Sequence, residues 1–189
     1  MIKQAIIPLA GLGTRLLPLT SVFAKELLPI NGKPGIEYIL DECIEAGIKE
    51  VIFIISKKKM MIKKYFYNDK FYKDIIKQKK DLRIIKEYKK ILRYRKKIKF
   101  VYQNKPKGTG DAVLKTKRFI KDKYFLMLLP DDLIIKKNCS ISMIRSHKIH
   151  TGNFFFDIIN TPSRNLIFIY FHTSHDACIK FFMCSNHRF

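Results

Sequence analysis

The stretch Gln4-Ala5-Ile6-Ile7-Pro8-Leu9-Ala10-Gly11-Leu12-Gly13 decides the fold class of this chain. From Gln4 to Leu9 it is a mostly apolar run, which predicts a buried strand. The run ends at a glycine loop, where the chain can turn sharply and bring its backbone close to a ligand. A buried strand that enters a glycine loop predicts the opening unit of an α/β domain.

The residues that follow continue an alternation of strand and helix. Five apolar residues have the spacing of one helix face: Ile36, Ile39, Leu40, Cys43 and Ile44. Pro34 suits the first turn of this helix, and Gly47 suits its end. Apolar runs predict further strands at 51–55, 99–102 and 124–129, with a helix over about 110–120. Strands that alternate with helices predict a parallel sheet covered on both faces.

The composition is strongly basic, with 38 Lys and Arg residues, 16 Asp and Glu residues and a formal net charge of +22. Such a charge is typical of proteins that bind nucleic acids or other polyanions. However, 30 of the cations are Lys and the chain also has 29 Ile, a bias expected of an A- and T-rich genome. Residues 1–56 carry a net charge of −1 and residues 57–107 one of +17. The positive charge is therefore concentrated in one segment.

Within this segment, residues 57–97 lie between two predicted strands. Apolar residues recur there at roughly helical intervals, which predicts two or three helices with a thin apolar stripe and a Lys-rich outer face. The segment is either a solvated helical insert or an arm that binds RNA or DNA. Only three of the 21 cations in residues 57–107 are Arg, the residue suited to bidentate phosphate and base contacts. We therefore favour the insert and expect no nucleic-acid partner.

Hydrophobic residues make up 47% of the chain, which predicts a folded domain. The apolar runs are too short to span a bilayer, and the N-terminus lacks the pattern of a signal peptide. The cysteines at 43, 139, 178 and 184 are too scattered for a disulfide framework. We expect a cytoplasmic protein with no membrane partner.

The glycine loop is the strongest candidate for chemistry. Gly11 and Gly13 allow backbone N–H groups to approach phosphate oxygens closely. The loop lacks the G-K-[ST] ending of a Walker loop, and Leu16 stands where G-x-G-x-x-G needs its third glycine. Arg15 can clamp a polyphosphate, and Lys25 can neutralise a charged phosphoryl transition state.

Three ordered blocks of the sequence resemble the signature of the sugar nucleotidyltransferase family. They are Leu9–Pro18 with Ala24–Pro29, then Gln103–Val113, then Leu129–Asp132. The resemblance covers about residues 1–149 and is greatest to the branch that transfers uridylyl groups. It implies a Rossmann-like, mostly parallel sheet with helices on both faces. It also implies transfer of a uridylyl group from UTP to glucose 1-phosphate, with Mg²⁺ as cofactor, and a homo-oligomer.

The resemblance implies roles for individual residues. Arg15 and Lys25 are the expected catalytic residues, and Asp131 is the expected Mg²⁺ ligand. The expected nucleotide-binding residues are Ala10, Gly11, Gly13, Glu26, Gln103 and Gly108. The amide of Gln103 offers both a donor and an acceptor, as reading a uracil edge requires. From the residues alone, Gln103 also suits a polar loop and Asp131 also suits a helix cap.

One position departs from the family pattern, because Asp111 stands where the family has His. A carboxylate beside a triphosphate is unfavourable unless it points away from it.

Residues 150–189 differ from the rest of the chain. They hold eight of the 15 Phe and four of the five His, and the family pattern stops near His150. We expect residues 1–149 to form the nucleotide-binding part, and 150–189 to be a tail outside the family fold that lacks the sugar site. The tail holds ligand types suited to zinc, but their spacing matches no standard finger, and we favour accidental clustering: His172, His175, Cys178, Cys184 and His187.

Two other functions stay open at this point. One is a catalytically incomplete nucleotide-binding remnant, and the other is a basic nucleic-acid-binding protein.

Overall fold

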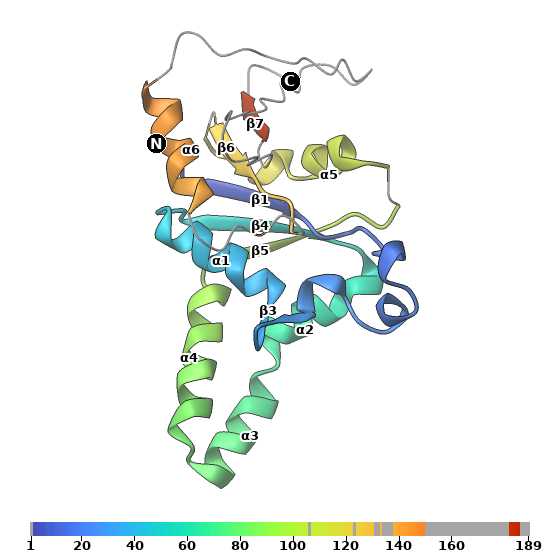
Figure 1. The fold of residues 1–189 in the computed structure, drawn as a ribbon, viewed down its shortest axis with the longest axis vertical. Coiled ribbons are helices and arrows are strands. Elements are labelled where there is room, and N and C mark those ends of the chain that lie inside the picture. The colour runs from blue at the N-terminus through green and yellow to red at the C-terminus, as the bar shows by residue number, and fades with distance from the viewer. Residues whose placement is uncertain are drawn as a thin grey trace.

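The computed structural model describes residues 2–105, 107–122, 124–130, 133, 138–149 and 182–185. Its centre is a five-stranded sheet in the order β5-β4-β1-β6-β7 (Figure 1). The strands are β1 (Gln4–Pro8), β4 (Glu50–Ile55), β5 (Ile98–Tyr102), β6 (Tyr124–Met127) and β7 (Phe182–Ser185). The first four run parallel, and β7 pairs antiparallel with β6. The prediction of a mostly parallel sheet is confirmed.

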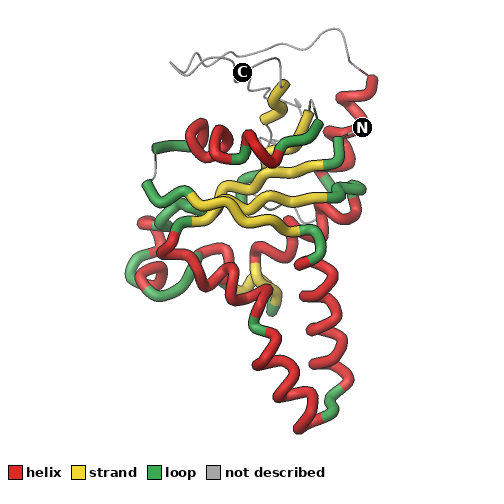
Figure 2. The backbone as a smooth tube through the Cα atoms, turned by 180° about the vertical axis from the view of Figure 1, so that it is seen from behind, coloured by secondary structure: helices red, strands yellow, loops and turns green. Residues whose placement is uncertain are grey.

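Helices cover both faces of this sheet (Figures 1 and 2). They are α1 (Gly35–Glu45), α2 (Met60–Tyr67), α3 (Asp69–Lys79), α4 (Leu82–Arg95), α5 (Thr109–Lys115) and α6 (Cys139–Ile149). Residues of α1, α2, α4 and α6 share one core cluster, and residues of α5 belong to a second cluster on the opposite face. Short 3-10 helices complete the fold: η1 (Thr14–Leu16), η2 (Leu19–Ser21), η3 (Lys25–Leu27), η4 (Lys57–Lys59) and η5 (Lys117–Phe119). A small hairpin of β2 (Pro29–Ile30) and β3 (Lys33–Pro34) precedes α1.

The apolar character of β1 follows from its central place in the sheet. Ala5 and Ile7 pack into the cluster on the α1 face, and Ile6 packs into the cluster on the α5 face. All three are fully buried, because successive side chains of a strand point to opposite faces of the sheet and helices cover both faces. A strand in this position needs an unbroken apolar run, which is what the sequence contains.

The predicted element boundaries are close to the observed ones, with one clear difference. Helix α1 begins at Gly35 directly after Pro34, and Gly47, with φ of +80°, follows its end. The segment 57–97 contains the three helices α2, α3 and α4. The helix predicted over 110–120 instead divides into α5 and η5. It divides at Thr116, whose buried hydroxyl donates to the carbonyl of Val113 at 2.6 Å.

Helices α3 and α4 form a hairpin that projects away from the sheet (Figures 1 and 2). In the part of the chain that the structure describes, no helix has the length and apolar character needed to cross a membrane. Of the predicted tail, residues 182–185 form β7 and extend the sheet. The other residues of the tail, including the candidate zinc ligands apart from Cys184, lie outside the described residues.

Candidate functional site

The strand order creates a binding position at the carboxyl ends of the parallel strands. From β1 the chain proceeds outward to β4 and β5, and it then returns to place β6 on the other side of β1. Helix α1, between β1 and β4, covers one face of the sheet, whereas α5, between β5 and β6, covers the other. The chain therefore changes direction between β1 and β6, and open α/β sheets bind ligands at the carboxyl ends of the strands at such a point. A pocket of about 230 Å³ lies there. Its lining residues are Pro8, Ala10, Gly11, Lys25, Glu26, Gln103, Gly108, Thr109, Ala112, Leu129 and Pro130.

Six of the residues singled out from the sequence line this pocket together. They are Ala10, Gly11, Lys25, Glu26, Gln103 and Gly108. They come from the loops after β1 and β5 and from η3, so segments far apart in the sequence converge at one edge. Arg15 lies in η1, is exposed and is not among the lining residues. Asp131 lies outside the described residues.

The glycine loop is shaped by a left-handed residue at Gly13, with φ of +71°. The Thr20 hydroxyl donates to the Gly13 carbonyl at 2.8 Å, which ties the loop to the turn that follows. A Cβ at Gly13 would lie 3.1 Å from Thr20 Cγ2 and 3.6 Å from Lys25 Cδ, so glycine allows this close approach. A Cβ at Gly11 would meet nothing within 4 Å, so the backbone of Gly11 lies beside open space in the pocket.

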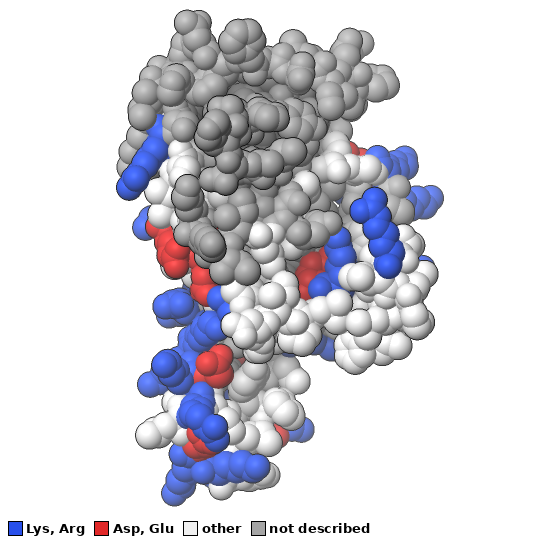
Figure 3. All heavy atoms as spheres, viewed as in Figure 1, with Lys and Arg blue, Asp and Glu red and all other residues white. Residues whose placement is uncertain are grey.

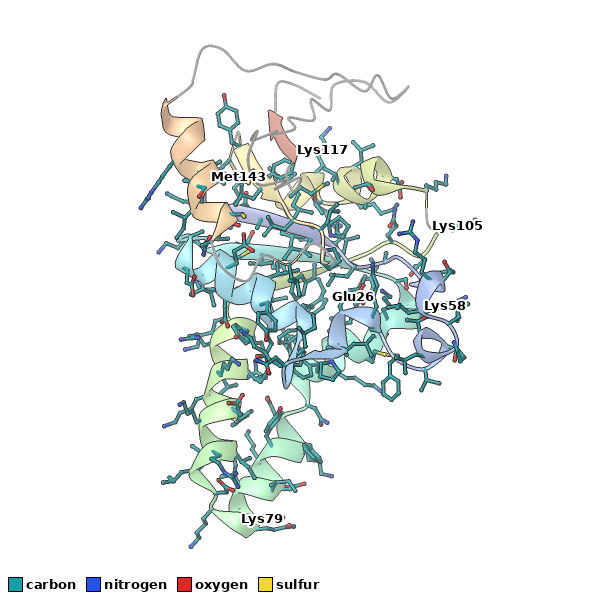
Figure 4. The ribbon with its side chains drawn as sticks, in the orientation of Figure 1. Glu26, Lys58, Lys79, Lys105, Lys117 and Met143 are labelled. Atoms are coloured by element: carbon teal, nitrogen blue, oxygen red, sulfur yellow. The ribbon has the colours of Figure 1, made fainter. Side chains whose placement is uncertain are left out.

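Glu26 is held by a buried ion pair with Lys59. Lys59 Nζ donates to Oε1 and Oε2 of Glu26 at 2.7 and 2.8 Å. The side chains are 1% exposed for Glu26 and 7% for Lys59. Both carboxylate oxygens are thus engaged by one ammonium group, which fixes the orientation of Glu26 at the pocket wall. In Figure 4, Glu26 lies toward the interior and Lys58 lies farther out.

Lys59 is not among the site residues predicted from the sequence. The lysine run 57–59 is predicted to belong to a solvated face, but only Lys57 and Lys58 of this run are exposed. The tight turn of η4, in which the Lys59 amide donates to the Ser56 carbonyl at 2.9 Å, brings the third lysine inward. No signal in the local sequence separates Lys59 from its neighbours, because its partner is 33 residues away.

Gln103 follows β5 and is 4% exposed. Its backbone N–H donates to the Ile55 carbonyl at 2.8 Å, which continues the pairing of β5 with β4. Its side-chain Nε2 donates to the Gly108 carbonyl at 3.2 Å and to Asp111 Oδ2 at 2.7 Å. Asp111 is not among the pocket-lining residues, and its other oxygen lies 3.8 Å from Lys115 Nζ. The carboxylate of Asp111 is thus engaged by Gln103 and Lys115.

Gly108 connects the Gln103 loop to α5. Its φ of +90° lies in a region that L side chains rarely adopt, so a substitution there strains the backbone. Since Gly108 both lines the pocket and accepts the hydrogen bond from Gln103, its conformation helps to set the shape of this wall.

No group of three or more His, Cys, Asp or Glu side chains suited to a metal ion occurs among the described residues. Glu26 lines the pocket, but Lys59 engages both of its oxygens. Leu129 and Pro130 line the pocket at the end of β6, and Asp131 is the next residue in sequence.

The chain is similar to known proteins over most of its length. The sequence model of the family described as Nucleotidyl transferase matches residues 4–165. A putative UTP–glucose-1-phosphate uridylyltransferase of Methanocaldococcus jannaschii is 37% identical over 153 residues, which cover 78% of this chain and 52% of that protein. The UTP–glucose-1-phosphate uridylyltransferase of Bacillus subtilis is 39% identical over 133 residues, or 70% of this chain and 45% of that protein. The chain thus spans about half the length of these curated relatives.

Solved structures show the same similarity in three dimensions. A UTP-bound UGPase from Acinetobacter baumannii superimposes with a TM-score of 0.70 and 31% identity, covering 80% of this chain and 54% of that one. A UDP-glucose pyrophosphorylase complexed with UDP-glucose gives a TM-score of 0.63 and 30% identity, covering 80% of this chain and 55% of that one.

Proposed function

The chain belongs to the nucleotidyl transferase family, and from this membership we propose that its pocket binds UTP. We further propose that the protein transfers the uridylyl group to glucose 1-phosphate, giving UDP-glucose and pyrophosphate. The observation that carries the proposal is the convergence of the glycine loop, Lys25 and Gln103 in one pocket at the switch point of the sheet. Two of the similar solved structures contain bound UTP and UDP-glucose, which supports the choice of nucleotide.

The proposed reaction is a single in-line displacement. A phosphate oxygen of glucose 1-phosphate attacks the α-phosphorus of UTP, the bond to the β-phosphate oxygen breaks, and pyrophosphate leaves with that oxygen. Such a reaction needs positioning and charge neutralisation rather than covalent participation by the protein.

Six of the predicted residues have direct roles in this proposal. The backbone of Ala10 and Gly11 contacts the nucleotide, Gly13 allows the loop to fold over Lys25, and Gln103 reads the uracil edge. Lys25 neutralises the charge that develops at the α-phosphate. Arg15, which lies outside the pocket lining, holds the departing pyrophosphate beyond the glycine loop.

We propose Mg²⁺ as the cofactor, with Asp131 as its protein ligand. The Asp131 carboxylate follows the pocket-lining residues Leu129 and Pro130 in sequence and is a suitable donor for this oxygen-preferring ion. When bound, the ion would add positive charge beside the triphosphate. The scattered cysteines support a reducing compartment, and we therefore place the protein in the cytoplasm. We also propose that it forms a homo-oligomer, as the resemblance to the family implies.

Calorimetric titration of the chain with UTP and Mg²⁺, with ATP as the competing nucleotide, tests the proposal. We expect binding of UTP in preference to ATP, and a loss of at least about tenfold in UTP affinity for Gln103→Ala, because one base-reading hydrogen bond is removed. Asn104→Ala is the matched control, since it removes an amide from the adjacent, exposed residue. A folded chain that binds neither nucleotide, or both equally, would overturn the proposal.

Turnover is tested separately by release of pyrophosphate from UTP in the presence of glucose 1-phosphate. Binding of UTP without turnover would support the nucleotide-binding remnant rather than the transferase.

A further inference from the structure

Gln103 has the only amide side chain among the described residues that line the pocket, and Asp111 accepts a hydrogen bond from it. Gln103 Nε2 carries two hydrogens, and the structure directs them to two acceptors, the Gly108 carbonyl and Asp111 Oδ2. Neither acceptor can donate a hydrogen bond, because one is a backbone carbonyl and the other belongs to a carboxylate. Both hydrogens of the amide are therefore directed to groups that require a donor.

These two contacts determine which way the amide faces. If the amide were rotated by a half-turn, its oxygen would face two acceptor oxygens at hydrogen-bonding distance, and the two donated bonds would be lost. Among the described residues, none donates a hydrogen bond to Gln103 Oε1. This oxygen is nevertheless absent from the buried polar atoms that lack a partner, so it is accessible. Since Gln103 lines the pocket, Oε1 is the atom that it can offer to a ligand.

The position of Asp111 is itself well defined. It lies in the first turn of α5, where a negative charge is stabilised by the helix dipole. Ala112 and Val113, the next two residues, are buried in the core cluster on this face of the sheet and fix the helix. Lys115 lies one turn further along the same helix with its ammonium 3.8 Å from Asp111 Oδ1.

We propose that Asp111 is a specificity-determining residue that acts through Gln103. By fixing the amide with its oxygen available, it makes the pocket an acceptor for the N3–H of a uracil-type base. Cytosine has an unprotonated N3 that is itself an acceptor, so it would meet Gln103 Oε1 with repulsion. The inference rests on the proposed function and deepens it, because it assigns pyrimidine selection to a residue outside the pocket lining.

Asp111→Asn and Asp111→Ala test this assignment. Asn has nearly the same shape as Asp, but its Nδ2 can donate to a reversed Gln103 amide, and Ala removes the acceptor altogether. For both variants, we expect the ratio of UTP affinity to CTP affinity to fall by about tenfold, the effect of one misoriented hydrogen bond. Asp111→Glu retains a carboxylate and is expected to keep most of the wild-type ratio.

Asp74→Asn is the matched control, since it makes the same chemical change on the exposed surface of α3. Its ratio should equal that of the wild type. A second measurement needs no substitution: N3-methyl-UTP lacks the N3–H, and we expect the wild-type chain to bind it at least about tenfold more weakly than UTP.

The outcomes distinguish a failure of the proposed function from a failure of the role assigned to Asp111. A wild-type chain that does not bind UTP would overturn the proposed function and this inference with it. A wild-type chain that prefers UTP, combined with an unchanged ratio in Asp111→Asn and Asp111→Ala, would overturn this inference alone. Equal weakening of UTP and CTP binding would also overturn it, because that result indicates a purely structural role for Asp111.

Discussion

The buried ion pair of Lys59 and Glu26 shows how the partner of one carboxylate can determine the chemistry of a pocket wall. A carboxylate at 1% exposure is costly to bury unless it is paired with a cation. The Lys59 ammonium is that cation, and it donates to both oxygens of Glu26. The pair also leaves Glu26 unable to move toward a ligand without losing two charge-assisted hydrogen bonds. Glu26 therefore shapes the pocket from a fixed position.

Replacing Lys59 tests this interpretation at the scale of one residue. Lys59→Met leaves the Glu26 carboxylate buried without its ammonium partner, and we expect a loss of about 3–5 kcal/mol in the free energy of unfolding. Urea denaturation measures this change. Lys58→Met is the matched control and should change the stability little, because Lys58 is exposed.

A double variant tests the cause of the loss. Glu26→Gln combined with Lys59→Met should recover part of the stability, because a neutral amide leaves no unpaired charge in the interior. If the double variant is as unstable as Lys59→Met, loss of packing rather than charge explains the effect.

At the scale of elements, Glu50 of β4 connects β1, β5 and the loop before β6. It lies at the start of β4, where it accepts from Gln4 Nε2 at 2.8 Å and pairs with Lys99 of β5 at 2.7 Å and Lys121 at 3.4 Å. Partial burial raises the pKa of Glu50, but the hydrogen bonds and charges of Lys99, Gln4 and Lys121 outweigh it and hold this pKa below its ordinary value. The folded state therefore favours the ionised form.

The lowered pKa of Glu50 predicts a pH dependence of stability. The ionised Glu50 carboxylate contributes to the free energy of unfolding. This contribution is fully present above the ordinary glutamate pKa of about 4.3 and is lost as the pH falls through the lower pKa of the folded state. We expect Glu50→Gln to lose about 1 kcal/mol at pH 7, and this difference from the wild type to shrink as the pH falls below about 4.

Urea denaturation from pH 7 to pH 3 measures the effect. Glu87→Gln is the control, because Glu87 is largely exposed and lies 3.9 Å from Lys90. A difference between wild type and Glu50→Gln that stays constant across this range would contradict the assignment.

At the scale of the whole molecule, the α3–α4 hairpin differs from the rest of the fold. Helix α3 has no buried residue, and the buried residues of α4, Ile91 and Tyr94, lie in its last two turns. Tyr94 fixes the base of the hairpin through its hydroxyl, which donates to Asp41 of α1 at 2.6 Å. Lys79 is near the tip, and cationic side chains gather along the hairpin (Figures 3 and 4).

Hydrogen exchange should reveal this difference in stability. Helices α1 and α3 both have 11 residues, but α1 has six buried residues and α3 has none. We expect the amides of α3 to exchange much faster than those of α1, because local opening of the hairpin exposes little apolar surface. Mass-spectrometric exchange at matched peptides measures this, and equal protection of the two helices would contradict it.

Local pattern was enough to predict much of the architecture. The apolar run of β1, the helical spacing of α1 and the turn at Gly47 determined the alternation of strand and helix, because burial and backbone conformation depend on nearby residues. The glycine loop and the blocks around Gln103 likewise indicated where nucleotide chemistry belongs, and the structure brings six of those residues into one pocket.

Only the tertiary structure decided which polar groups meet. The burial of Lys59 depends on a turn of η4 and on a carboxylate from another segment, and the orientation of the Gln103 amide depends on the backbone of Gly108 and on the position of α5. Such pairs are selected by geometry across the fold, since a lysine or an aspartate has the same local pattern whether it faces water or a partner. The sequence by itself therefore determined the four parallel strands, most of the helices and the place of the pocket, while packing determined the electrostatics of the pocket wall.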